Sequence, residues 1–240
     1  MGAPPKSPQL RACETMIVFV PDPISSSPSL KFGLLATLSF RTSRRAELLM
    51  IDIGKRAAQI GVSIHDYYRF AWRTAARTGA TEVRVVFPDA FCDPARTREL
   101  FYQFLRMTRR HGWLKMYVAH NFWETYDPPP EADIIALPAR RQCFTSCSRS
   151  PETCAARIIN FLASRVEDRP IHLLGPALRT LRLVLASRQP FSSFDTIAYR
   201  RAVDSELKSL QGGKWNVEKG RETLFLSRWL ERAGLKLDKN

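Results

Sequence analysis

Residues 82–119 read EVRVVFPDAFCDPARTRELFYQFLRMTRRHGWLKMYVA and contain one complete strand–helix–strand unit. The apolar runs Glu82–Phe87 and Lys115–Ala119 predict two buried strands. Between them, Asp93 precedes a proline, which is typical of a helix N-cap, and apolar residues recur at helical spacing up to Arg110. Such a unit predicts two parallel strands joined by a crossover helix.

The alternation of short apolar runs with longer helical patterns continues in both directions. Apolar residues at helical spacing predict further helices over 64–78, from Pro151 through Leu162, and over 178–187. Eight strands are predicted, at Met16–Val20, Leu34–Ser39, Leu48–Ile53, Glu82–Phe87, Lys115–Ala119, Ala132–Leu137, Pro170–Leu174 and Ser193–Ile197. The predicted fold is therefore an α/β, TIM-type (β/α)8 barrel with a C-terminal helical extension, irregular at 121–131, where no helical pattern is present.

The ends of the chain differ in composition from the barrel. We expect a flexible, proline-rich N-terminal segment at 1–15, the barrel at 16–206 and a basic C-terminal helical extension at 207–240. Trp215 and Trp229 lie among basic residues there, and either stack on nucleic-acid bases or dock the final helix on the barrel. No run of eighteen apolar residues and no signal-peptide pattern occurs, so we expect a cytoplasmic protein with no membrane partner.

The chain is strongly basic. Its 240 residues include 37 Lys and Arg, most of them Arg, against 23 Asp and Glu, which gives a net charge of +14. Arginine presents a planar fork of donors that matches phosphate oxygens in pairs, so this charge favours a polyanionic partner, nucleic acid first. The alternative is a surface whose arginines are merely solvated or paired, as in heat-stable proteins.

The five cysteines form no strong metal-binding pattern. Cys143, Cys147 and Cys154 are spaced Cys-x3-Cys-x6-Cys without a nearby histidine, which is a weak zinc signal. The odd number of cysteines and their polar or helical surroundings argue against a disulfide framework, although a single bridge stays open. We expect neither a metal nor a cofactor.

In parallel barrels the chemistry gathers at the carboxyl ends of the strands. The residues at or just after a predicted strand end are Asp22, Asp52, Asp89, His120, Arg140 and Asp195. Carboxylates at such positions bind a divalent metal, divide nucleophile and acid–base roles, or cap the following helices. Asp93 is expected to be a cap. Asp195 stands inside a buried strand, where an unpartnered carboxylate is costly, so a functional role is open for it.

Six segments, taken in their order along the chain, carry a resemblance to a known family: Leu49–Gly54, Val85–Asp89 with Asp93–Pro94, His111–Trp113, Ala132–Leu137, Ile171–Gly175 and Ser193–Thr196. In this order and spacing, from about Leu34 to Ala202, the chain resembles the transglycosylase superfamily. This superfamily includes the tRNA-guanine transglycosylases and their archaeal, bacterial and phage relatives acting on DNA. The strand ending in Asp52 matches a strand that ends Asp-Ser-Gly in the family. Phe194–Asp195 is similar to the segment that carries the family's nucleophile.

The resemblance implies exchange of a base at a nucleoside, with tRNA or DNA and a purine or 7-deazapurine base as partners. Asp195 would attack C1′ of a guanosine and form a glycosyl-enzyme. Asp52 would be the general acid and base, and Asp89 would accept hydrogen bonds from the purine edge. The substrate site would also include Gly175, Arg140 and His120. Such an enzyme takes the target base out of its stack.

A basic rim would hold the nucleic-acid backbone while the base is extruded. We expect this contact to be made by Arg141, Arg200, Arg201, Lys214, Arg221 and Arg228. A homodimer or a larger nucleic-acid-modification complex is left open.

The chain departs from the family's pattern at several positions. Lys55 stands where a small residue is expected, and the strand before Arg140 lacks the Gly-Gly that lets guanine approach the backbone. A second hypothesis is therefore a catalytically degenerate basic barrel that binds nucleic acid or a ribonucleoprotein. A third is a barrel enzyme with a phosphate substrate, in which Arg140 and Arg141 clamp the anion. His120 and His172 are expected to be structural or hydrogen-bonded rather than catalytic.

Overall fold

The computed structural model describes residues 15–21, 30–38, 45–53, 61–120, 128–139, 151–166, 169–187, 191–196 and 221–235, except for the side chains of 151, 152 and 221–225. Within these ranges eight strands and five helices form an α/β barrel of the TIM type. The strands are β1 (Met16–Val20), β2 (Leu30–Thr37), β3 (Leu48–Asp52), β4 (Glu82–Val86), β5 (Leu114–Val118), β6 (Ile134–Pro138), β7 (Ile171–Leu174) and β8 (Ser193–Asp195). The helices are α2 (Ile64–Thr78), α3 (Pro94–Thr108), α4 (Pro151–Ala163), α5 (Leu178–Ala186) and α7 (Arg221–Ala233). The predicted fold class is confirmed.

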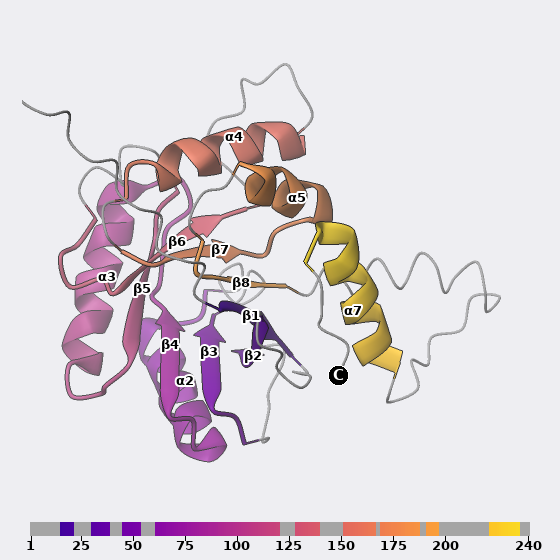
Figure 1. Cartoon of the computed structure of the whole chain (residues 1–240). Coiled ribbons are helices and arrows are strands. Elements are labelled where there is room, and N and C mark those ends of the chain that lie inside the picture. The colour runs from indigo at the N-terminus through magenta and orange to yellow at the C-terminus, as the bar shows by residue number, and fades with distance from the viewer. Residues whose placement is uncertain are drawn as a thin grey trace, which may run out of the picture.

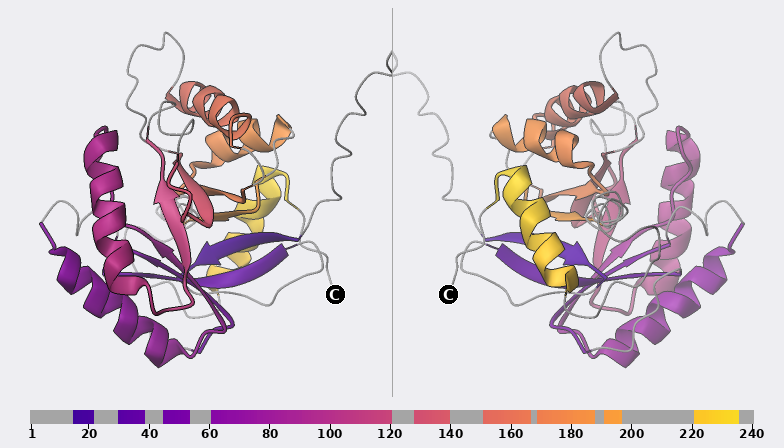
Figure 2. Two further views of the ribbon diagram at one scale, coloured as in Figure 1. Left: turned by 90° about the vertical axis from the view of Figure 1, so that its left-hand side faces the viewer. Right: turned by 90° about the vertical axis from the view of Figure 1, so that its right-hand side faces the viewer.

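The barrel is closed and parallel. Each strand pairs with the next one along the chain, and β8 pairs in parallel with β1. The helices form a layer outside the strands (Figure 1). Helix α7 lies beside α5, on the opposite side of the barrel from α3 (Figure 2). No helix in the described ranges is long and apolar enough to cross a membrane.

The final helix docks on the barrel. Its residues Leu226, Trp229 and Leu230 are buried in the same core as the outer faces of the strands. The Trp229 ring packs against Phe194 of β8, with 6.3 Å between the ring centroids. Of the two roles expected for the C-terminal tryptophans, Trp229 therefore has the docking role. Trp215 lies outside the described residues.

Along each strand, residues that face the interior of the barrel alternate with residues that face the surrounding helices. Side chains of six strands fill the interior, namely Phe19, Leu35, Met50, Val86, Met116, Val118, Ile134 and Ala136. A larger apolar core lies between the strands and the helices. Since the interior is packed, the barrel is a solid core, and chemistry is expected at its rim rather than in a channel.

Strand β2 begins four residues earlier than the sequence pattern predicts. Lys31 and Gly33 interrupt the apolar run, so its first half does not look like a strand. The register places Gly33 opposite Phe19 of β1. A Cβ atom on Gly33 would lie 2.4 Å from Cε1 of the Phe19 ring, so glycine is needed to make room for that ring. The other predicted strand and helix ends differ from the observed ones by at most two residues.

Helices α2 and α3 begin at side-chain caps. The Asp66 backbone N–H donates to Ser63 Oγ (3.1 Å), and the Arg96 backbone N–H donates to Asp93 Oδ1 (2.9 Å). Pro94 occupies the first turn of α3, as the sequence predicts. Asp93 is therefore a capping residue, as the sequence predicts.

We expect Gly33→Ala to lower the free energy of unfolding by about 1–3 kcal/mol, because the new methyl group overlaps the Phe19 ring. Urea unfolding followed by circular dichroism measures the change. Gly112→Ala is the matched control, since nothing lies within 4 Å of a Cβ there. The double variant Gly33→Ala/Phe19→Leu should lose less stability than the two single variants together. Equal losses in Gly33→Ala and Gly112→Ala would contradict this packing.

Candidate functional site

The structure brings five of the sequence-predicted site residues to one rim of the barrel. Asp52 is the last residue of β3, Asp89 follows β4, and His120 follows β5. Gly175 follows β7, and Asp195 ends β8. Because all strands are parallel, these positions share the carboxyl end of the barrel.

Most of the remaining predicted site residues lie outside the part of the chain that the structure describes. The ones outside the described residues are Asp22, Lys55, Arg140, Arg141, Arg200, Arg201 and Lys214. Arg221 begins α7, but its side chain is not described. Arg228 is exposed on α7. The nucleic-acid contacts assigned to these residues stay predictions.

Tyr67 of α2 joins the ends of β3 and β4 beneath two of the carboxylates. Its buried hydroxyl lies 2.7 Å from the Val86 carbonyl oxygen and 3.2 Å from that of Ile51. Burial raises the pKa of Tyr67 well above its ordinary value, and the charges of Asp52 and Asp89 raise it further. Because β3 and β4 are neighbouring strands, Asp52 and Asp89 lie on the same side of the rim.

Asp89 is held by its neighbour across the strand ends. A hydrogen bond joins its Oδ2 to Nε2 of the buried His120. The Phe91 ring packs edge-on against His120, with 5.2 Å between the ring centroids, and is 50% exposed. Thr97 Oγ1 lies 3.0 Å from both the N–H and the carbonyl oxygen of Ala90, which fixes the turn that carries Phe91. The expectation that His120 is hydrogen-bonded is confirmed.

Two cysteines near this region are disulfide-bonded. They are Cys92, which follows Phe91 in a left-handed conformation (φ 62°), and Cys154 on α4. The sequence argued against a disulfide framework and left one bridge open, and the structure shows that bridging does occur. Spacing along the chain did not reveal it, because disulfide formation depends on which segments meet in space. Cys154 is therefore not a thiolate available to a metal, while Cys143 and Cys147 lie outside the described residues.

Asp195 is anchored through one of its carboxylate oxygens. The Gly175 backbone N–H donates to Oδ1 at 2.9 Å, and Nε2 of the fully buried His172 lies 3.1 Å from the same atom. Gly175 has a φ of 55°, a left-handed conformation that favours glycine. The side chain of Asp195 is mostly buried, and 8% of the residue is exposed. The expectation that His172 is hydrogen-bonded is confirmed.

The network continues from His172 into the barrel interior through residues that the sequence analysis missed. Nδ1 of His172 lies 2.8 Å from Ser193 Oγ, and Nη1 of Arg84 donates to the same oxygen at 3.2 Å. The Arg84 guanidinium also donates from Nε to Glu82 Oε1 at 2.6 Å. One signal was present in the sequence, because Arg84 is a charged residue in the middle of an otherwise apolar predicted strand.

The order Ser193–His172–Asp195 has the connectivity of a nucleophilic triad, but it does not work as one here. Ser193 is 0% exposed and accepts a hydrogen bond from Arg84, so its hydroxyl has no access to a substrate. Asp195 is the member nearest the rim. The arrangement therefore presents a supported carboxylate at the rim.

No protein-family model matches the chain, and no curated protein matches its sequence. Three solved structures are distantly similar. They are the BexX/CysO complex of Amycolatopsis orientalis (TM-score 0.41, 12% identity, 70% of this chain and 71% of that one), active domain 2 of a chitinase from Pyrococcus furiosus (0.39, 10%, 79% and 75%), and 2,3-dimethylmalate lyase, a PEP mutase/isocitrate lyase superfamily member (0.32, 15%, 87% and 69%). Likenesses at this level say nothing about activity. They lend no support to the transglycosylase resemblance, which stays a prediction.

We expect the free energy of unfolding to fall as the pH drops below about 6.5. Burial lowers the pKa of His172, Asp195 opposes this, and the positive charge of Arg84 lowers it further. Below the unfolded pKa, the unfolded chain therefore binds a proton that the folded chain excludes. The loss should be at most about 1.4 kcal/mol per pH unit, until the folded pKa is reached. Urea unfolding between pH 7.5 and 5.5 measures it, and equal slopes for the wild type and His172→Asn would contradict it.

Proposed function

We propose that this chain is a nucleic-acid base-exchanging glycosyltransferase that replaces guanine by a deazaguanine in tRNA or DNA, with Asp195 as the nucleophile. The observation that carries the proposal is the one-sided anchoring of Asp195, since both of its donors meet Oδ1. Among the described residues, none makes a hydrogen bond to Oδ2. That oxygen is the one that would attack C1′.

The proposed reaction has two displacements. Asp195 Oδ2 forms a bond to C1′ while the bond from C1′ to the guanine nitrogen breaks, and the electron pair leaves with the base. Asp52, protonated at that moment, gives the departing nitrogen its proton. The incoming deazaguanine nitrogen then attacks C1′, releases the Asp195 carboxylate and returns a proton to Asp52. The sugar keeps its configuration after two inversions.

The side of the rim at β4 and β5 suits the flat face and polar edge of a purine. Asp89 Oδ2 is engaged by His120, which leaves Oδ1 to accept from the amide or amino edge of guanine. The exposed Phe91 ring next to it offers a surface on which a base stacks. Asp52 lies on the same side of the rim, where a departing base nitrogen would need a proton.

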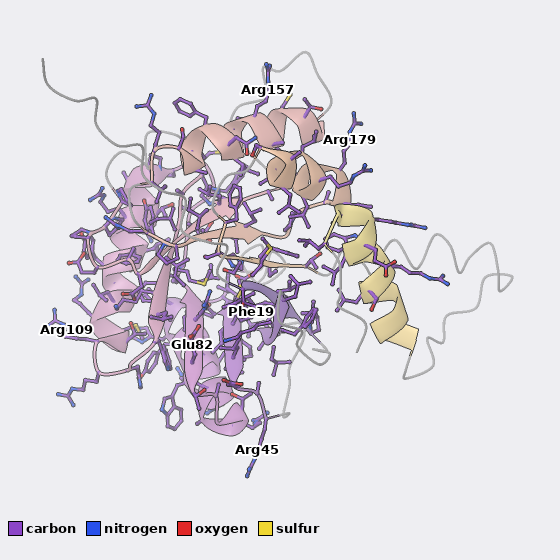
Figure 3. All side chains as sticks on the ribbon, viewed as in Figure 1. Phe19, Arg45, Glu82, Arg109, Arg157 and Arg179 are labelled. Atoms are coloured by element: carbon purple, nitrogen blue, oxygen red, sulfur yellow. The ribbon has the colours of Figure 1, made fainter. Side chains whose placement is uncertain are left out.

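The charge of the surface supports a nucleic-acid substrate. Exposed arginines lie on every described helix, and those labelled in Figure 3 point outward on different sides of the molecule. The exposed arginines on the helices include Arg69, Arg73 and Arg77 on α2, Arg96 and Arg106 on α3, Arg157 on α4, Arg179 and Arg182 on α5, and Arg228 and Arg232 on α7. Such a surface attracts phosphates without reading sequence.

The decisive experiment is capture of the covalent glycosyl-enzyme. We expect the wild type, mixed with guanine-containing tRNA or DNA and a 7-deazaguanine base, to form an adduct that survives denaturing electrophoresis. Asp195→Asn should abolish the adduct and lower base exchange by several orders of magnitude, because the nucleophile is lost. Asp93→Asn is the matched control, since asparagine still caps α3 and the residue is outside the proposed chemistry.

Absence of an adduct with every guanine-containing RNA and DNA tested would contradict the proposal. If the protein then binds nucleic acid with an affinity that falls steeply with salt, and Asp195→Asn binds equally well, the basic barrel is a binding module. The exposed arginines are the observation that favours this second function.

Phe91→Ala should weaken binding of a guanine-containing oligonucleotide by about tenfold, because a stacked base is worth roughly 1–3 kcal/mol. Phe161→Ala is the control, since Phe161 is also an exposed ring (41%) but lies on α4, packed against Arg165. Fluorescence anisotropy at fixed salt compares the two variants. Equal affinities would remove Phe91 from the site.

A further inference from the structure

A series of hydrogen-bonded side chains runs through the barrel interior to Asp195. The residue at its far end takes no part in the proposed reaction. We call Arg84, Ser193, His172 and Asp195 the interior chain. Its links are Arg84 Nη1 to Ser193 Oγ (3.2 Å), Ser193 Oγ to His172 Nδ1 (2.8 Å) and His172 Nε2 to Asp195 Oδ1 (3.1 Å). All four residues are at most 8% exposed, so water has little access to these links.

The two ends of the interior chain give it a direction. A guanidinium only donates hydrogen bonds, so Ser193 Oγ accepts from Arg84. An ionised carboxylate only accepts, so the hydrogen between His172 and Asp195 belongs to His172 Nε2. If His172 Nε2 carried no hydrogen, its lone pair would face the negative Oδ1 oxygen, which is repulsive.

The direction fixes the tautomer of His172. Burial and the nearby positive charge of Arg84 favour the neutral ring, which carries one N–H. With that hydrogen on Nε2, the bare Nδ1 accepts from the Ser193 hydroxyl, and the hydroxyl in turn accepts from Arg84. Every link is then satisfied, and the only hydrogen of the imidazole nitrogens points at Asp195.

Arg84 is itself held on three sides. Its Nε donates to Glu82 two residues earlier on the same face of β4, its guanidinium lies 5.4 Å from the centroid of the Phe19 ring, and its Nη1 reaches Ser193 across the barrel. The register pairs Arg84 with Met50, which lies two residues before the end of β3, and with Leu114, the first residue of β5. Arg84 thus lies below the rim and does not reach a substrate there.

We propose that Arg84 is a positioning residue, which acts through Ser193 to keep the hydrogen of His172 on Nε2 and so to fix the Asp195 carboxylate with Oδ2 toward the rim. The catalytic consequence rests on the proposed function of Asp195. The control of the His172 tautomer does not. Asp195 Oδ1 then receives two N–H donors, from His172 and Gly175, and the carboxylate is held in one orientation before the substrate arrives.

The first test measures the tautomer without any substrate. Nitrogen-15 NMR of histidine-labelled protein at pH 7.5 distinguishes Nε2–H, Nδ1–H and doubly protonated rings, and His172→Asn identifies the signal among the four histidines. We expect a neutral His172 ring with its hydrogen on Nε2. A ring with Nδ1–H, or a doubly protonated ring, would overturn the proposal.

The second test breaks the interior chain at two places. Ser193→Ala and Arg84→Met should slow adduct formation at least about tenfold, with an unchanged Kd for the nucleic acid, because only the nucleophile loses its orientation. Arg84→Lys keeps a donor toward Ser193 and should recover part of the rate. Ile134→Val is the control, since it removes one methyl group from the same barrel interior outside the interior chain.

Unchanged rates in both Ser193→Ala and Arg84→Met would overturn the positioning role. If these variants lose their fold, the rate and the spectrum of Arg84→Lys, compared with those of the wild type, still decide it. If the wild type itself forms no adduct, the proposed function fails. The spectra of the wild type and of Arg84→Met, compared under the same conditions, then still decide whether Arg84 sets the tautomer of His172, so the two failures are distinguishable.

Discussion

The pairing of β8 with β1 is the contact on which the rest of the structure depends. Strand β8 has three residues, and the register sets Ser193 beside Ile17 and Asp195 beside Phe19. Hydrogen bonds from Ile17 N–H to the Ser192 carbonyl (3.1 Å) and from Thr196 N–H to the Phe19 carbonyl (3.0 Å) extend this short seam. Closure removes both open edges of the sheet. It also brings Asp195 to the rim that Asp52 and Asp89 share, and Ser193 within reach of Arg84.

The sequence predicts those parts of the molecule that depend on local pattern. Strands and helices follow from apolar spacing, and the rim positions of Asp52, Asp89 and Asp195 follow from their places at the ends of apolar runs. The link between Arg84 and Ser193 does not, because the two residues are 109 positions apart and meet only through the register of a closed barrel. The early start of β2 was hidden for a similar reason, since Gly33 is explained by a ring on another strand.

In the proposed function, the positive surface charge and the site at the rim would have separate roles. Exposed arginines occur at helix starts near the rim, such as Arg96 and Arg179, and also at the opposite end, such as Arg77 and Arg109. Attraction to phosphates is therefore a property of the whole domain, which would serve a nucleic acid larger than the barrel mouth. In the proposed function, selection of one base would fall to the rim, where Asp89, His120 and Phe91 lie together.

The disulfide at Cys92 has a practical consequence for the handling of this protein. Cys92 lies between the turn that carries Phe91 and the first residues of α3, and its sulfur is covalently tied to another part of the chain. A thiol reductant in the buffer would remove that tether directly beside the mouth of the barrel. Preparations made with and without such a reagent are therefore different molecules at this surface. Their affinities should be determined separately, after the free thiols have been counted.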